Sequence, residues 1–172
     1  CACRGLVWAC CRGTEVDRKV WVGKESLARR TAAHGLHLPG TAGRLSEVLA
    51  GYRGVPLAGY VPIRTEIDPL PAMAEAAAHG SVGVPVIRAA GQSLVFSQWD
   101  PDCAMVDGPL GASVPETERL MTPELLTVPR VAFSRAGGRV GEGGGMYERT
   151  IAKAGRARAT FANGSGSCSP TA

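Results

Sequence analysis

The stretch that decides the fold begins with Leu125-Leu-Thr-Val-Pro-Arg-Val-Ala-Phe133 and continues with Arg139-Val-Gly-Glu-Gly-Gly-Gly-Met-Tyr-Glu-Arg149. The first part is the most strand-like run of the chain, and the second predicts a glycine-rich turn followed by a helix from about Gly145 to Ala154. Glycines let backbone N–H groups face an anion, and a helix N-terminus adds partial positive charge. The order of strand, glycine-rich turn and helix therefore favours a phosphate-binding site. A plain flexible turn is the alternative, because the motif is neither G-x-G-x-x-G nor a P-loop.

The rest of the chain alternates between helical and strand-like segments. Helices are predicted over 17–33, 41–49 and 69–78, and strands over 57–63, 82–87 and 93–96. This alternation predicts one α/β domain, residues 18–154, with a largely parallel sheet. A long loop is predicted over 100–115, and tails over 1–17 and 155–172.

Composition narrows the class of protein. The chain has 172 residues, 45% of them hydrophobic, and a net charge of +4, which fits a protein that handles anions. Basic runs lack interleaved aromatic residues, so no nucleic-acid partner is expected. No apolar run approaches the roughly 20 residues of a membrane span, so no membrane association is expected. Cys1, Cys3, Cys10 and Cys11 do not have zinc-site spacing, which favours a reduced tail.

Two further segments carry candidate binding residues. Glu66 and Asp68 follow the predicted strand 57–63, and ligands bind at that end of open parallel sheets. Asp68 has an alternative role as the cap of the helix that begins at Pro69, so Glu66 is the better candidate. Phe96 and Trp99 are either walls of a pocket for a flat ligand or core residues.

Several of these segments together resemble the 5-formyltetrahydrofolate cyclo-ligase (methenyltetrahydrofolate synthetase) family in order and spacing. They are Gly59-Tyr-Val-Pro-Ile-Arg-Thr-Glu-Ile-Asp68, Val84-Pro-Val86, Gln92-Ser-Leu-Val-Phe-Ser-Gln-Trp99, Gly108-Pro-Leu-Gly111, Pro115 and the block 128–149. Upstream, the segment from Lys19 to Arg30 resembles the family's first helix.

The resemblance implies a three-layer α/β/α sandwich and a monomeric, cytoplasmic ligase that uses ATP and Mg²⁺. Its reaction would convert 5-formyltetrahydrofolate to 5,10-methenyltetrahydrofolate. The resemblance assigns ATP binding to Lys19, Arg139, Gly141, Glu142, Gly143, Gly144, Gly145, Met146 and Tyr147. It assigns folate binding to Val61, Glu66, Trp99, Glu142, Met146 and Tyr147, catalysis to Arg139 and Tyr147, and Mg²⁺ to Glu148.

The chain also departs from the family pattern. Gly23 and Ser134 stand where the family has Arg and Asp, Glu142 adds a negative charge to the phosphate turn, and Glu148 replaces an Asp. Nothing in 155–172 resembles the family's C-terminal strands, so an uncovered sheet edge is expected. A degenerate member that binds nucleotide or folate weakly is therefore one alternative. Another phosphate-binding α/β protein, such as a sugar-phosphate isomerase or CoA-transferase relative, is the other.

Overall fold

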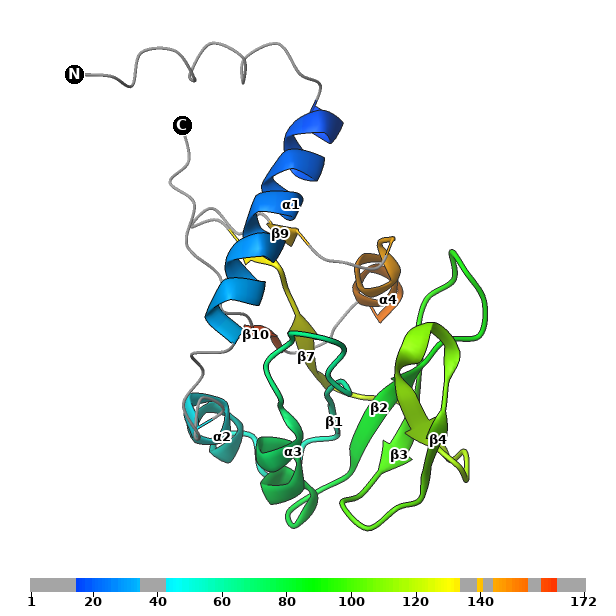
Figure 1. The fold of residues 1–172 in the computed structure, drawn as a ribbon. Helices are drawn as coiled ribbons and strands as arrows, with labels where there is room; N and C mark the ends of the chain where they lie inside the picture. Colours follow the sequence, from blue (N-terminus) through cyan, green and yellow to red (C-terminus); the bar gives the residue numbers. More distant parts are fainter. Residues whose placement is uncertain (1–14, 35–42, 134–138, 141–143, 155–158, 164–172) are drawn as a thin grey trace, which may run out of the picture.

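The structure, a computed structural model, describes residues 15–34, 43–133, 139–140, 144–154 and 159–163. A six-stranded sheet in the order β10-β7-β1-β2-β3-β6 forms its centre (Figure 1). The strands are β1 (Leu57–Ala58), β2 (Val82–Val86), β3 (Val95–Trp99), β6 (Leu120–Met121), β7 (Leu125–Pro129) and β10 (Ala159–Asn163). β10, β7, β1 and β2 are parallel, β3 pairs antiparallel with β2, and β6 pairs antiparallel with β3. The mostly parallel sheet is confirmed.

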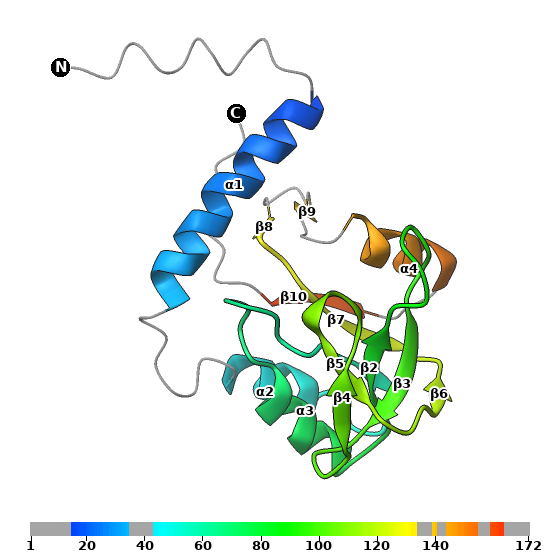
Figure 2. The same cartoon turned by 45° about the vertical axis from the view of Figure 1, so that its right-hand side comes forward.

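Helices cover both faces of this sheet (Figure 2). They are α1 (Glu15–His34), α2 (Gly43–Ala50), α3 (Leu70–Ala77) and α4 (Met146–Ala154). Leu57 and Leu125 pack with α2 and α3, whereas Ala58 and Leu126 pack with α4. Successive side chains of a strand point to opposite faces, so this alternation separates two core layers. The predicted three-layer sandwich is confirmed.

The start of α3 shows how local sequence sets the packing. Pro69 precedes the helix, and the Asp68 carboxylate accepts a hydrogen bond from the Leu70 N–H at 2.9 Å. The predicted capping role of Asp68 is therefore confirmed. A Cβ on Gly59 would lie 2.3 Å from the Met73 sulfur, so a larger residue here would have to displace the Met73 side chain of α3.

The loop predicted over 100–115 is wrong. This segment contains β4 (Met105–Asp107), the 3-10 helix η2 (Pro109–Gly111) and β5 (Ser113–Pro115). The two strands form an antiparallel pair in which Val106 lies opposite Val114. Strands of three residues around a Gly-Pro turn are too short for a periodic pattern, which is why they read as a loop.

The two predicted tails also need correction. α1 begins at Glu15, inside the segment predicted as the tail 1–17. Ala159–Asn163 forms β10 beside β7, with Ala159 opposite Leu125, so 155–172 is not all tail and this side of β7 is covered. The parallel ladder satisfies backbone groups that β7 would otherwise leave unpaired. Among the helices of the described residues, none has the length and apolar character that a bilayer crossing requires.

Candidate active site at the carboxyl edge of the sheet

The candidate site lies where the parallel strands β1 and β7 end, which we call the carboxyl edge. Tyr60 and Glu66 follow β1, and Arg130 follows β7 directly. Tyr147 belongs to the first turn of α4, which packs on the same face as Ala58 and Leu126. Because the strands are parallel, residues far apart in the chain meet at one edge.

Tyr147 links these groups electrostatically. Burial raises the pKa of the Tyr147 phenol well above its ordinary value, and the negative charges of Glu66 and Tyr60 raise it further. Arg130 lowers the pKa of the same phenol. Glu66, Tyr60 and Arg130 therefore lie within electrostatic range of Tyr147. The phenol keeps its proton near neutral pH and can donate it in a hydrogen bond.

The turn that carries Glu66 is braced by its own hydrogen bonds. The Glu66 carboxylate accepts a hydrogen bond from the Ile63 N–H at 2.9 Å, and the Tyr60 hydroxyl donates to the Ile67 carbonyl at 2.8 Å. Arg30 of α1, which is buried, donates from Nε to the Thr65 hydroxyl at 3.0 Å. Glu66 thus has a structural role that its sequence position did not reveal, and the brace fixes the direction of its carboxylate.

Arg130 is a member of the site that the sequence analysis missed. It is only 3% exposed, and its Nη1 donates to Glu148 Oε1 at 2.5 Å. Its Nε and Nη2 are buried and have no hydrogen-bond partner among the residues that the structure describes. Arg149 likewise has a buried Nε and Nη2 without a partner. The signal that could have identified Arg130 is its charge, because it is a cation within the otherwise apolar stretch Leu125–Phe133.

The backbone at the N-terminus of α4 can be approached closely by another group. Gly144 and Gly145 have φ angles of +60° and +78°, which glycine adopts without strain. The Arg149 N–H makes the first helical bond to the Gly145 carbonyl, at 3.1 Å, so the preceding N–H groups have no acceptor within the helix. The buried Thr150 hydroxyl accepts from the Leu94 N–H at 2.8 Å and donates to the Met146 carbonyl at 2.7 Å. This pair of bonds fixes α4 on the sheet.

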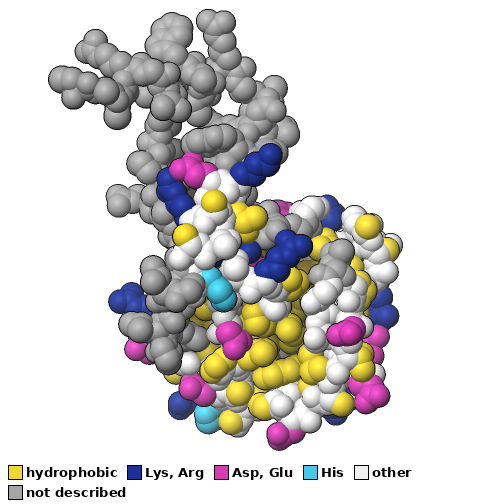
Figure 3. Space-filling model, in the orientation of Figure 1, with side chains coloured by type: hydrophobic (Ala, Val, Ile, Leu, Met, Phe, Trp, Pro, Cys, Tyr) yellow, Lys and Arg dark blue, Asp and Glu magenta, His cyan; other side chains and the backbone are white. Residues whose placement is uncertain are grey.

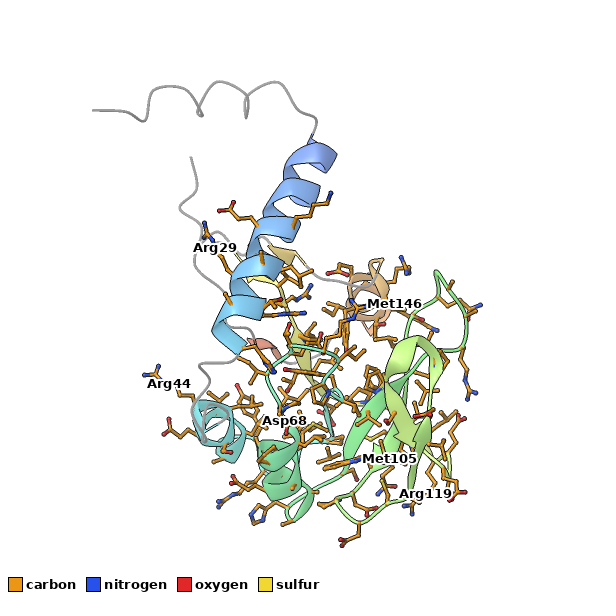
Figure 4. All side chains as sticks on the ribbon, in the orientation of Figure 1. Arg29, Arg44, Asp68, Met105, Arg119 and Met146 are labelled. Carbon is orange, nitrogen blue, oxygen red and sulfur yellow. The ribbon has the colours of Figure 1, made fainter. Side chains whose placement is uncertain are left out.

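The structure brings together some of the predicted site residues. They are Glu66, Gly144, Gly145, Met146, Tyr147 and Glu148. Figure 4 shows Met146 at α4, well separated from Arg119 and from Asp68 at the start of α3. Figure 3 shows an apolar area at the centre of the same view, bordered on its upper side by Lys and Arg side chains.

Other predicted residues lie elsewhere or outside the described part. Trp99 is buried in the core cluster that packs with α2 and α3, and Val61 packs against that cluster. Neither joins the cluster that contains Met146 and Tyr147. Lys19 lies in α1 and Arg139 in β9 (Arg139–Val140), which pairs with β8 (Ala132–Phe133) beside α1 (Figure 2). Gly141, Glu142, Gly143 and Ser134 lie outside the described residues.

The surroundings of Glu148 do not fit its predicted role as a Mg²⁺ ligand. One of its carboxylate oxygens is held by the buried Arg130 guanidinium. Within the described ranges no cluster of three or more His, Cys, Asp or Glu side chains exists that could hold a metal ion. Mg²⁺ prefers an octahedral set of oxygen ligands, and a guanidinium beside one of them repels a cation.

A cavity of about 360 Å³ lies at the opposite edge of the sheet. Its walls include the first residues of three parallel strands, Leu57, Val82 and Leu125, together with residues of α2 and α3. The cavity is therefore remote from the carboxyl edge. Its wall is mostly apolar, and Glu75 and His79 are charged or polar groups on it.

Comparisons with known proteins agree with this architecture. The model of the 5-formyltetrahydrofolate cyclo-ligase family matches residues 42–163. A search of curated proteins finds no match. The NMR structure of 5,10-methenyltetrahydrofolate synthetase from Aquifex aeolicus superposes with a TM-score of 0.66, at 21% identity, over 90% of this chain and 83% of that one. The family match covers most of the chain and the structural match gives the same fold. The chain belongs to the 5-formyltetrahydrofolate cyclo-ligase family.

Proposed function

We propose that the protein converts 5-formyltetrahydrofolate to 5,10-methenyltetrahydrofolate with ATP, releasing ADP and phosphate. The formyl oxygen on N5 takes the γ-phosphoryl group, and the bond from that phosphorus to ADP breaks. N10 then attacks the formyl carbon and loses its proton. The carbon–oxygen bond breaks next, and the oxygen leaves as part of phosphate. Membership in the cyclo-ligase family supports this reaction.

One observation carries the proposal: the Glu66 carboxylate raises the pKa of the Tyr147 phenol, so the two groups lie within electrostatic range of each other at the carboxyl edge. The carboxylate accepts hydrogen bonds, and the protonated phenol donates one. A pterin ring offers both N–H donors and a carbonyl acceptor, so the pair matches its polar edge. Met146 and Phe96 belong to one apolar cluster beside this pair, which suits the flat faces of the ring.

The nucleotide's phosphates are proposed to bind at the N-terminus of α4. The free N–H groups of its first turn favour an anion there, and the glycines before it leave room for the approach. Arg139 of β9 and Lys19 of α1 are the proposed additional cations, since α1 lies beside β8 and β9. Among the described residues no group of three or more His, Cys, Asp or Glu side chains could hold a metal ion, and no step of this proposal depends on one.

Absorbance of 5,10-methenyltetrahydrofolate tests the proposal. We expect it to grow in the presence of 5-formyltetrahydrofolate only when ATP is added. Thermal stabilisation by 5-formyltetrahydrofolate without any turnover would select the second candidate, a family member that only binds. The Arg130–Glu148 ion pair favours that candidate, because it alters a position where the resemblance implies a metal ligand. Stabilisation by a sugar phosphate and not by folate would contradict both.

A further inference from the structure

We propose that Arg130 takes the place of a divalent cation at Glu148 and binds a phosphoryl oxygen directly. The ligand class is a phosphate ester or a di- or triphosphate. The inference rests on the proposed function only for the identity of the molecule that carries the phosphate. Phosphate binding at this site would then not require Mg²⁺.

The first argument is the hydrogen bonding of Arg130. A guanidinium has five N–H donors in a planar fork and cannot lose its charge. Glu148 accepts from Nη1, at 2.5 Å, while Nε and Nη2 are buried and have no partner in the described part of the chain. Buried donors without acceptors are unfavourable and rare in folded proteins. Nε and Nη2 form the two-pronged side of the fork that suits a carboxylate or a phosphoryl group.

The second argument is the charge of the surroundings. Arg130 pairs with Glu148 through Nη1 and offsets its negative charge, which weakens the attraction of that carboxylate for a second cation. Arg149 adds a further positive charge, also with buried donors that lack a partner. The first turn of α4 contributes the partial positive charge of a helix N-terminus. Glu66 is the opposing carboxylate, and it acts on Tyr147. The sum of these positive and negative charges favours an anion over a metal ion.

The third argument is that these groups meet at Gly145. A Cβ placed on Gly145 would lie 3.1 Å from Arg149 Nη1 and 4.0 Å from Glu148 Oε2. Arg149 and Glu148 therefore both reach the start of α4, and Arg130 is bonded to the same Glu148 carboxylate. The side-chain cations and the free N–H groups of the helix converge on one place, as phosphate sites at helix N-termini require.

The test measures the affinity of the full chain for inorganic pyrophosphate and for ATP by calorimetry, in EDTA and in Mg²⁺. We expect binding in EDTA, and a loss of roughly tenfold or more for Arg130→Met, because a charge-assisted hydrogen bond is removed. Arg44→Met is the control, since Arg44 is exposed on α2 and points away from the site (Figure 4). It should bind as the native chain does.

Far-UV circular dichroism shows whether Arg130→Met folds. If it does not fold, Glu148→Gln tests the proposal instead. The Glu148→Gln variant is expected to retain or strengthen pyrophosphate binding in EDTA, because Arg130 loses a competing carboxylate. Three results would overturn the proposal. They are pyrophosphate binding that strictly requires Mg²⁺ and is lost in Glu148→Gln, native affinity in Arg130→Met, and no pyrophosphate binding at all. Arg130-dependent pyrophosphate binding without ATP-dependent turnover would contradict the proposed reaction and leave the Arg130 site standing.

Discussion

The two edges of the sheet differ in how their polar groups are satisfied. At the carboxyl edge, buried Arg130 and the neighbouring Arg149 each have two donor nitrogens that find no partner within the described ranges, and burial keeps the Tyr147 phenol protonated. At the amino edge, the cavity of about 360 Å³ is walled mainly by apolar side chains. Its charged or polar residues include Arg53, Glu75 and His79, which are exposed.

This difference shows that a cavity alone is a weaker guide to function than unsatisfied buried polar groups. An apolar cavity between helices follows from imperfect packing of α2 and α3 on the first residues of the strands. Buried donors without acceptors have a cost in the free protein, and a ligand that supplies the acceptors recovers it. Function is therefore expected at the carboxyl edge, and variants can test each side of the comparison.

The largest expected effect is that of Glu66→Gln on turnover. The amide keeps an oxygen for the Ile63 N–H, so the turn should survive, but the charge that binds the folate is lost. We expect kcat/KM to fall about a hundredfold, or about 2.7 kcal/mol. Glu75→Gln at the amino edge is the matched control and should leave kcat/KM unchanged. Equal losses in both variants would remove the distinction between the edges.

Thr150→Val should have the next largest effect, on stability. The change removes the acceptor of the buried Leu94 N–H, and the free energy of unfolding should fall by about 2 kcal/mol. Urea denaturation measures it. Thr31→Val is the control, because Thr31 also donates to a carbonyl four residues earlier but is exposed. Its effect should stay within about 0.5 kcal/mol. A silent Thr150→Val would mean that α4 is not anchored by this bond.

The sequence predicted that Glu66 lies near the glycine turn because parallel strands share their carboxyl edge, and in the structure Glu66 lies within electrostatic range of Tyr147 in the first turn of α4. The α3 helix was likewise predictable from Pro69 and Gly80, which are local signals. The ladder between β10 and β7 was not, since Ala159–Asn163 has no alternating pattern and its pairing is non-local.

Arg130 and Trp99 show that non-local packing also limits what the sequence can predict for single side chains. The sequence places Arg130 within the predicted strand 125–133, but its burial and its bond to Glu148 depend on where α4 packs. Trp99 stands next to a polar segment and was expected near the ligand. It faces the α2 and α3 layer because alternate residues of β3 point to opposite faces of the sheet.

Tyr147→Phe should change how stability depends on pH. An unfolded tyrosine loses its proton near pH 10, whereas burial and Glu66 raise the pKa of Tyr147 in the folded chain. Above pH 10 the unfolded state then binds fewer protons, so the free energy of unfolding falls as pH rises, by about 1.4 kcal/mol per pH unit. The Tyr147→Phe variant should lack this fall in the free energy of unfolding. Urea denaturation at pH 10 and 11 measures the slope, with pH 7 and 8 as the control range where the two slopes agree.

The smallest expected effect compares one glycine from each edge. Gly145 at the start of α4 and Gly54 at the amino-edge cavity both have positive φ angles, +78° and +81°. Alanine at either should lower the free energy of unfolding by about 1 kcal/mol, because a Cβ disfavours this conformation. Only Gly145→Ala places that Cβ 3.1 Å from Arg149 Nη1, so only this variant should also weaken pyrophosphate binding. Equal pyrophosphate affinity in both variants would show that the anion does not reach the start of α4, and would move the phosphate site away from the arginines.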